Sequence, residues 1–190
     1  MLDPIAESDD TEQRALTQRP TRLDNQRIGL CTNGKKAAEP TLQVLEEQLT
    51  ERYPELSFTY YKVPELNMLK DDGEIESIQR WAHSETDACF TAIGDCGSCT
   101  KFLTWVTDAI EVTETPAVGL LAHGFELDWQ SNARDLERPI RHVELPVRPE
   151  RIDIDRIHEK LPADVIDEIE TELVRPRTDH ERGAHTQTES

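Results

Sequence analysis

The sequence predicts an α/β fold, a three-layer Rossmann-like sandwich with a mainly parallel sheet of four to five strands. Short apolar or β-branched runs alternate with segments that carry apolar residues at helical spacing. Strands that alternate with helices of roughly ten to fifteen residues form βαβ units, whose sheets are covered by helices on both faces. The 190 residues suffice for one domain with a core of its own.

The predicted domain spans residues 26–174, between two polar ends. Residues 1–25 are acidic and lack sustained apolar periodicity, and residues 175–190 are similarly polar. Such segments bury too little apolar surface to offset the entropy lost on ordering. We therefore expect a disordered acidic leader and a disordered tail. Residues 1–10 also lack the basic start and apolar core of a signal peptide.

The first half of the domain predicts two strand–helix units. Residues 27–31 form a short apolar strand before the turn dipeptide Asn33-Gly34, and Pro40 begins a helix. Residues 56–63 show an alternating pattern that contains aromatic and β-branched residues. Such a pattern is typical of a strand, and this is the second one predicted. Acidic residues at 71 and 72 precede a second helix. The apolar helical faces consist of Leu42, Leu45 and Leu49 in the first helix and of Ile75, Ile78 and Trp81 in the second.

The second half repeats this alternation. Residues 88–93 form an apolar third strand, residues 116–121 a fourth and residues 141–145 a fifth. One helix follows the third strand, and a last helix precedes the polar tail. Their apolar faces consist of Phe102, Val106, Ala109 and Ile110 in the former and of Ile166, Ile169 and Leu173 in the latter.

Three polar segments follow predicted strand ends. They are Asn33-Gly34-Lys35, Asp95-Cys96 and His123-Gly124. Since ligands bind beyond the carboxyl ends of parallel strands, we expect Asn33, Cys96 and His123 to surround one pocket. Asn33, Gly34 and Lys35 are candidates for binding an anionic substrate group, and a plain turn is the alternative. His123 is either a general base or a structural histidine.

The run Gly94-Asp95-Cys96-Gly97-Ser98-Cys99-Thr100 is the main candidate for chemistry. It places two thiols three positions apart where a strand turns into a helix. The partial positive charge of a helix N-terminus favours thiolate over thiol. We expect Cys96 to be the more reactive thiol and to form a reversible disulfide with Cys99. Cys31 and Cys89 are predicted to be buried and free.

The neighbouring residues Asp95, Gly97, Ser98 and Thr100 are candidates for supporting roles. Asp95 either caps the turn or positions a proton, and its carboxylate disfavours a neighbouring thiolate. The alternative interpretation of the whole run is structural. The glycines would then allow a tight turn above two small, packed cysteines.

Paired cysteines also occur in zinc sites, but the spacing here favours no metal. A structural zinc site takes four ligands, usually from two short-spaced pairs, and the remaining cysteines lie in separate predicted strands. The two cysteines with His123 and a water molecule would make an open catalytic site, which is the competing hypothesis. The chain contains neither Gly-x-Gly-x-x-Gly nor a phosphate-loop motif, so no cofactor is predicted.

Composition argues against several classes of partner. Lys and Arg number 21 against 39 Asp and Glu, which gives a formal net charge of −18. This charge repels nucleic acid and anionic lipid. No apolar run approaches the roughly 20 residues of a membrane helix. The acidic surface indicates adaptation to high salt. Four cysteines do not make a disulfide scaffold, so we expect a cytoplasmic protein with reduced thiols.

The order strand, Asn-Gly-Lys, helix and Gly-Asp-Cys-Gly-Ser-Cys-Thr resembles the UGSC family over residues 27–150. The family is named for selenocysteine-Gly-Ser-Cys, and the resemblance assigns the selenocysteine position to Cys96 and the final cysteine to Cys99. It implies demanding nucleophilic or redox chemistry, because selenium seldom serves packing. The motif is also similar to the selenocysteine turn of the B subunits of glycine and betaine reductases, which use selenium as a nucleophile on carbon.

Two classes of function remain open. In a thiol-dependent enzyme, Cys96 attacks an electrophilic carbon or an oxidised sulfur of a small-molecule substrate, and Cys99 resolves the adduct. This class includes a thiol oxidoreductase supplied by a thiol electron donor, and a substrate-activating protein that works with a partner reductase subunit. In the second class, the thiols switch the surface of a non-enzymatic subunit or a redox-responsive interaction protein.

Overall fold

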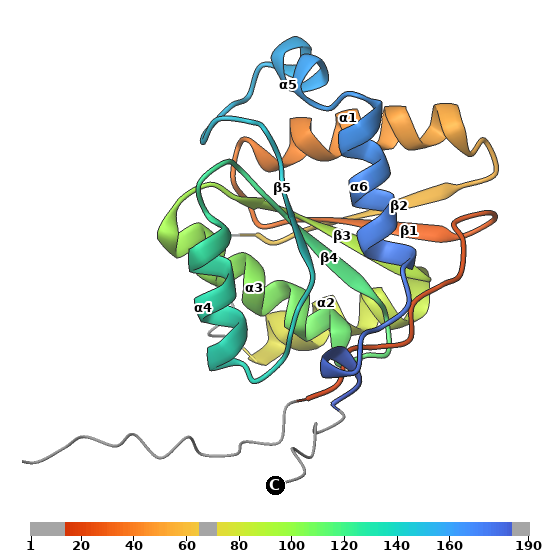
Figure 1. Cartoon of the computed structure of the whole chain (residues 1–190), viewed down its shortest axis with the longest axis vertical. Helices are drawn as coiled ribbons and strands as arrows, with labels where there is room; N and C mark the ends of the chain where they lie inside the picture. The colour runs from red at the N-terminus through yellow and green to blue at the C-terminus, as the bar shows by residue number, and fades with distance from the viewer. Residues whose placement is uncertain (1–13, 65–71, 184–190) are drawn as a thin grey trace, which may run out of the picture.

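Five parallel strands form the centre of the molecule. The computed structural model describes residues 14–64 and 72–183. The sheet has the strand order β2-β1-β3-β4-β5, and every neighbouring pair is parallel (Figure 1). The predicted α/β, Rossmann-like fold with a parallel sheet is therefore confirmed. The strands are β1 (Arg27–Thr32), β2 (Ser57–Lys62), β3 (Ala88–Gly94), β4 (Ala117–Leu121) and β5 (His142–Glu144).

Helices cover both faces of this sheet and complete the three layers. One apolar cluster packs α1, α5 and α6 against one face, and two clusters pack α2, α3 and α4 against the other (Figure 1). Adjacent residues of β3 show the division, because Phe90 belongs to the first cluster and Cys89 to the second. The helices are α1 (Ala38–Arg52), α2 (Asp72–Glu85), α3 (Gly97–Glu111), α4 (Glu126–Asp135), α5 (Ile154–Lys160) and α6 (Ala163–Val174).

β3 occupies the middle of the sheet, and all seven of its residues are buried. It is hydrogen-bonded to β1 on one side and to β4 on the other. Its composition fits this position, since strands of parallel sheets buried on both faces are continuous apolar runs. The segment that follows β3 therefore emerges at the centre of the carboxyl edge, between the loops that follow β1 and β4.

Two helices, α4 and α5, were not predicted from the sequence. In α4 only Trp129 and Ala133 are buried, and in α5 only Ile157. The Trp129 ring packs over Gly119 of β4 so closely that a Cβ on Gly119 would lie 2.1 Å from it. One large side chain thus anchors α4, which leaves no periodic apolar pattern in the sequence. Within the described ranges, no helix combines the length and the apolar character needed to cross a membrane.

The described parts of the predicted leader and tail, residues 14–25 and 175–183, pack against the domain. Leu16 and Leu23 are 1% and 3% exposed, and the buried Arg19 guanidinium pairs with the Glu111 carboxylate of α3. In the tail, Glu181 is 5% exposed. These contacts join segments that are far apart in the sequence. They pair buried charges and bury apolar side chains. The remaining parts of the leader and tail lie outside the described residues.

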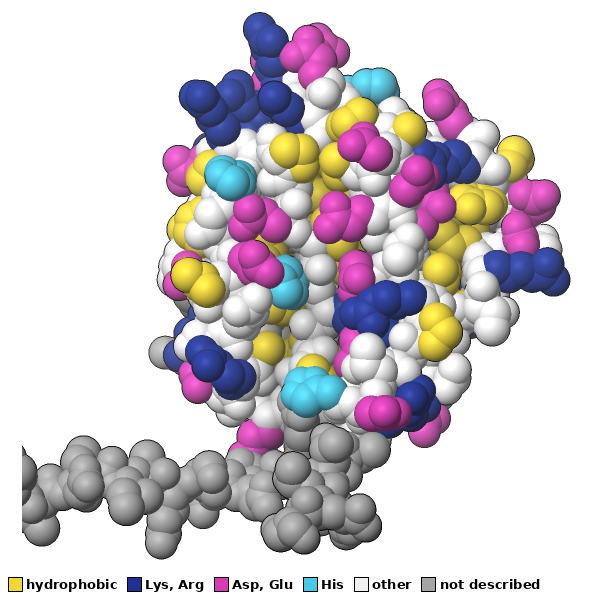
Figure 2. All heavy atoms as spheres, viewed as in Figure 1, with side chains coloured by type: hydrophobic (Ala, Val, Ile, Leu, Met, Phe, Trp, Pro, Cys, Tyr) yellow, Lys and Arg dark blue, Asp and Glu magenta, His cyan; other side chains and the backbone are white. Residues whose placement is uncertain are grey.

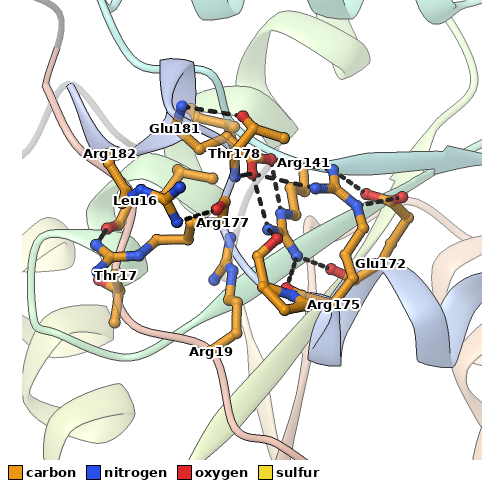
Figure 3. A network of polar contacts seen from close by, with 12 residues as sticks. Leu16, Thr17, Arg19, Arg141, Glu172, Arg175, Arg177, Thr178, Glu181 and Arg182 are labelled. Carbon is orange, nitrogen blue, oxygen red and sulfur yellow. Dashed lines mark hydrogen bonds and ion pairs between the residues drawn. The ribbon is translucent and has the colours of Figure 1, made fainter. Parts of the chain in front are cut away.

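A network of buried ion pairs holds the tail beside β5 (Figure 3). The Arg141 guanidinium donates to both carboxylate oxygens of Glu181, at 2.8 and 2.9 Å. Arg175 donates to the same carboxylate, and Thr178 caps it with a backbone N–H at 2.8 Å. The Arg141 and Glu181 side chains are 1% and 7% exposed. Since both charges are buried, removing either would leave its partner uncompensated.

Acid should destabilise the protein as the Glu181 carboxylate becomes protonated. Burial alone would raise the pKa of Glu181, but hydrogen bonds from Arg141 and Arg175 outweigh burial and lower it from 4.5 to about 2. Because the folded-state pKa lies below the unfolded one, this group contributes stability that is present above about pH 4.5 and lost as the pH falls toward 2. Denaturant titrations at several pH values measure this contribution. The Glu181→Gln variant should lose less stability across that window than the wild type, and an equal loss would contradict the assignment.

Candidate functional site

The two cysteines of the motif lie where β3 turns into α3. Cys96 is the N-cap of α3, with an extended backbone, and its Sγ accepts the backbone N–H of Cys99 at 3.2 Å. The backbone N–H and the hydroxyl of Thr100 both donate to the carbonyl oxygen of Cys96, each at 2.8 Å. At the N-cap of a helix, the side-chain atom that accepts a backbone N–H is usually an oxygen of Ser, Thr, Asp or Asn. Here a sulfur atom takes that position and receives a helix amide.

Cys96 and Cys99 are joined by a disulfide across the first turn of α3, with their Cα atoms 5.1 Å apart. Cys31 and Cys89 are free and buried. The predicted pairing is therefore confirmed, and its reversibility stays a prediction. Cys96 is half-buried, whereas Cys99 is 1% exposed. A molecule that approaches from solvent meets the Cys96 sulfur first.

The other two thiols are poor nucleophiles. Burial raises the pKa of Cys31 well above its ordinary value and that of Cys89 to about 12. The Cys89 sulfur lies 3.2 Å from the Thr86 hydroxyl in the core. Both thiols are therefore protonated at neutral pH, and thiol chemistry depends on Cys96 and Cys99.

Gly97 and Ser98 form the exposed side of the turn. The Ser98 hydroxyl lies 3.5 Å from the Cys96 sulfur, which places it beside the exposed atom of the pair. A Cβ on Gly97 would lie 3.9 Å from a carboxylate oxygen of Asp128, so the first turn of α4 comes close to the motif.

Asp95 places a buried carboxylate directly before the cysteine pair. It is 2% exposed, and its Oδ2 accepts the backbone N–H of Glu150 at 3.1 Å. Its Oδ1 makes no hydrogen bond but lies 3.4 Å from the Lys35 ammonium. The same ammonium lies 3.5 Å from the Glu150 carboxylate. Lys35 thus compensates a buried negative charge beside the thiols and joins the loops that follow β1, β3 and β5.

Asn33 fastens the loop after β1 to the end of β3. Its side chain is fully buried, and its amide nitrogen donates to the carbonyl oxygen of Ile93 at 2.9 Å. Its amide oxygen accepts the backbone N–H groups of Ile93 and Lys35, both at 3.2 Å. Gly34 has a φ of +80°, which glycine adopts without strain. These contacts assign Asn33 a positioning role, and substrate binding by Asn33, Gly34 and Lys35 stays a prediction.

His123 lies at the carboxyl end of β4, on the same edge of the sheet as the cysteine pair. Its side chain is 77% exposed, and its Nδ1 lies 2.7 Å from a carboxylate oxygen of Glu144. The Gly124 N–H donates to the other oxygen of Glu144 at 3.0 Å. Among the described residues, no hydrogen bond or ion pair joins His123 to Asn33 or Cys96. The shared edge is confirmed, and the common pocket and the role of His123 as a base stay predictions.

The motif also brings together three atoms of the kind that bind metal ions. One ligand atom each from Asp95, Cys96 and Cys99 lies within 4.8 Å of the others. A metal takes cysteine as the thiolate, and in the disulfide neither sulfur is one. The Asp95 carboxylate is already paired with Lys35. In this structure the disulfide and the ion pair with Lys35 therefore engage all three side chains.

Sequence reasoning missed the loop that follows β5. Glu150 has a φ of +58°, and its N–H is the hydrogen-bond donor to Asp95. The carbonyl oxygen of Val147 in the same loop accepts the His123 N–H at 2.9 Å. The position of this loop in the sequence could have identified it, because the loop follows a strand end just as the other three polar segments do.

Removing the Lys35 ammonium should slow the alkylation of Cys96. In the reduced protein, the uncompensated Asp95 carboxylate would disfavour the neighbouring thiolate. We expect Lys35→Met to lower the iodoacetamide rate at Cys96 at neutral pH by roughly three- to tenfold, measured by mass spectrometry of the labelled peptide. Lys62→Met is the matched control, because Lys62 pairs with Glu39 on the surface. Equal rates in wild type and Lys35→Met would show that Asp95 does not act on the thiol.

Comparison with known proteins agrees with this geometry. The model of the UGSC family matches residues 1–174, which include the whole cysteine motif and all five strands. No curated protein and no solved structure matches the chain. The family match covers most of the sequence, and the paired cysteines occupy the turn for which the family is named. The chain therefore belongs to the UGSC family.

Proposed function

We propose that this protein is a thiol oxidoreductase that reduces a small-molecule disulfide through Cys96 and Cys99. The observation that carries the proposal is the Cys96–Cys99 disulfide at the N-terminus of α3, with one sulfur accessible and the other buried. Paired thiols in this position form and break disulfides through their thiolates. The accessible Cys96 is the attacking residue, and the buried Cys99 is the resolving residue.

The reaction balances between the dithiol and the substrate. The Cys96 thiolate attacks one sulfur of the substrate disulfide, so a Cys96–substrate bond forms, the substrate S–S bond breaks and the other half leaves as a thiolate. The Cys99 thiolate then attacks the Cys96 sulfur, which forms the Cys96–Cys99 disulfide and releases the second half as a thiolate. Two electrons pass from the protein to the substrate, and the two substrate thiolates take up protons from solvent.

Three features of the site support the first step. The N-terminus of α3 carries partial positive charge, and the Cys99 N–H points at the Cys96 sulfur. The first turn of α3 contains no acidic residue. Lys35 compensates the charge of Asp95. All three favour the thiolate of Cys96, which is the reactive form of a cysteine.

A complete cycle requires a reductant that converts the disulfide back to the dithiol. A small dithiol donor or a partner reductase subunit would supply the two electrons by the same exchange reaction. Turnover by the isolated protein with dithiothreitol as donor supports the enzyme. Turnover that occurs only with a co-purifying partner would favour the alternative, a subunit of a larger reductase.

Cys99→Ser should trap the first intermediate. With the resolving thiol absent, the mixed disulfide between Cys96 and the substrate has no route to the internal disulfide, because serine is not a comparable leaving or attacking group. After exposure to hydroxyethyl disulfide, intact mass should show one stable adduct, and peptide mapping should place it on Cys96. The reduced wild type should instead lose two hydrogens and retain no adduct.

The double variant Cys96→Ser/Cys99→Ser is the matched control and should form no adduct. An adduct on Cys31 or Cys89, or a mixed disulfide as long-lived in the wild type as in Cys99→Ser, would contradict the assigned roles.

A further inference from the structure

A basic pocket lies on the same edge of the sheet as the cysteine pair. It has a volume of about 370 Å³ and is lined by residues of the loop after β5 and of α5. Figure 2 shows Lys and Arg side chains gathered in this region, at the top of the molecule. This is unusual for a chain with a net charge of −18. The charged residues that line the pocket are Arg148, Arg151, Arg156, Lys160 and Glu159.

Most of these cations have no partner of opposite charge. Arg156 pairs with Glu159 at 3.0 Å. In the described part of the chain, no carboxylate lies within 4.0 Å of the charged groups of Arg148, Arg151 or Lys160. The lining holds four cationic side chains, Arg148, Arg151, Arg156 and Lys160, against the single carboxylate of Glu159. Unpaired like charges repel one another, so an anion placed between them would relieve that repulsion.

The loop that carries the arginines is fixed to the cysteine site. The Glu150 N–H is hydrogen-bonded to the Asp95 carboxylate, one residue before Cys96. The Glu150 carboxylate lies 3.5 Å from the Lys35 ammonium and so does not compensate the positive charge of the neighbouring arginines. On the other side, Val147 accepts the His123 N–H. The loop also contains prolines at 146 and 149, which restrict its backbone. The backbone of the loop that carries Arg148 and Arg151 is therefore anchored to the loops that follow β3 and β4.

We propose that this pocket binds the anionic group of the small molecule on which Cys96 acts, a phosphate or a carboxylate. The proposal rests on the proposed function for its substrate and adds the chemical class of that substrate. Arginine guanidinium groups bind phosphate and carboxylate oxygens with paired hydrogen bonds, so Arg148 and Arg151 supply the main contacts. A local cationic pocket also attracts an anionic substrate, which the rest of the acidic surface repels.

Binding is tested on the oxidised protein, which undergoes no thiol exchange. Isothermal titration with pyrophosphate and with citrate at low ionic strength should show saturable binding of at least one probe, and the stronger probe identifies the anion. The Arg148→Gln/Arg151→Gln variant should bind at least about tenfold more weakly. Arg80→Gln/Arg134→Gln is the matched control, because it removes the same charge from exposed positions on α2 and α4. No saturable binding, or equal weakening in both variants, would overturn the proposal.

Kinetics then connects the pocket to Cys96. With oxidised glutathione, an anionic disulfide, the Arg148→Gln/Arg151→Gln variant should raise KM about tenfold and leave kcat unchanged. With the neutral hydroxyethyl disulfide, both constants should equal those of the wild type. An unchanged KM for the anionic disulfide would overturn the pocket as a substrate site while leaving the thiol chemistry intact. The thiol chemistry itself fails only if replacing Cys96 preserves turnover.

Discussion

Replacing Arg141 by methionine should lower the free energy of unfolding by about 3–5 kcal/mol, the range measured when one partner of a buried ion pair is removed. The Arg141 side chain is 1% exposed. Besides Glu181, its guanidinium donates to the carbonyl oxygens of Glu172, Arg175 and Pro176, at 2.7 to 3.2 Å. Methionine preserves most of the stem and none of these donors. In the variant, the buried Glu181 carboxylate would keep its ion pair with Arg175 but lose the one with Arg141. Three backbone carbonyl oxygens would also lose this hydrogen-bond donor.

Urea unfolding followed by circular dichroism measures the change. Arg22→Met is the matched control, since the Arg22 side chain is 80% exposed and its ion pair with Asp24 lies on the surface. Pairs of that kind contribute about 0–1 kcal/mol. A loss below about 1 kcal/mol for Arg141→Met would show that the tail is not held by this network.

The fold was predictable because its strands and most of its helices leave local patterns. β3 is a continuous apolar run, and α3 shows apolar residues at helical spacing, so both were found within a few residues of their bounds. The helices that were missed bury few side chains. α4 is attached by Trp129, and a single large residue generates no periodicity.

The packing of residues 14–25 and 175–183 leaves no local pattern in the sequence, for another reason. Residues 14–25 are polar in composition, yet Arg19 forms an ion pair with Glu111, which lies 92 residues further along the sequence. Such a contact depends on where two segments meet in the folded chain. A low content of apolar residues predicts disorder only if the polar groups have no partners in the domain.

The same distinction applies to the candidate site. The contacts of the CxxC motif are local, because Cys96 and Cys99 are three residues apart on one helical turn, so sequence alone predicts the pair. The contact of Lys35 with Glu150 spans 115 residues and exists because the sheet brings the loops after β1, β3 and β5 to one edge. Strand order, which the sequence pattern does not specify, decides which of those loops touch.

Cys96→Ser should abolish disulfide reduction, lowering kcat/KM by at least about three orders of magnitude. The hydroxyl of serine is protonated at neutral pH and forms no stable bond to sulfur. The fold should survive, since serine is among the preferred N-cap residues and its oxygen can accept the Cys99 N–H in place of sulfur. Unfolding curves of wild type and variant, both reduced, should therefore agree within about 1 kcal/mol. Turnover of hydroxyethyl disulfide with dithiothreitol as donor, monitored by the loss of the dithiol, provides the rate.

Cys31→Ala is the control for the loss of a thiol as such, and its turnover should match that of the wild type. Cys31 lies in the core of the sheet, and burial raises its pKa well above the ordinary value. If Cys96→Ser retained turnover, the nucleophile would have to be another thiol. Cys99 is 1% exposed, and both Cys31 and Cys89 are buried and protonated at neutral pH. Because the other three cysteines are buried, retained turnover would contradict Cys96 as the nucleophile and with it the proposed mechanism.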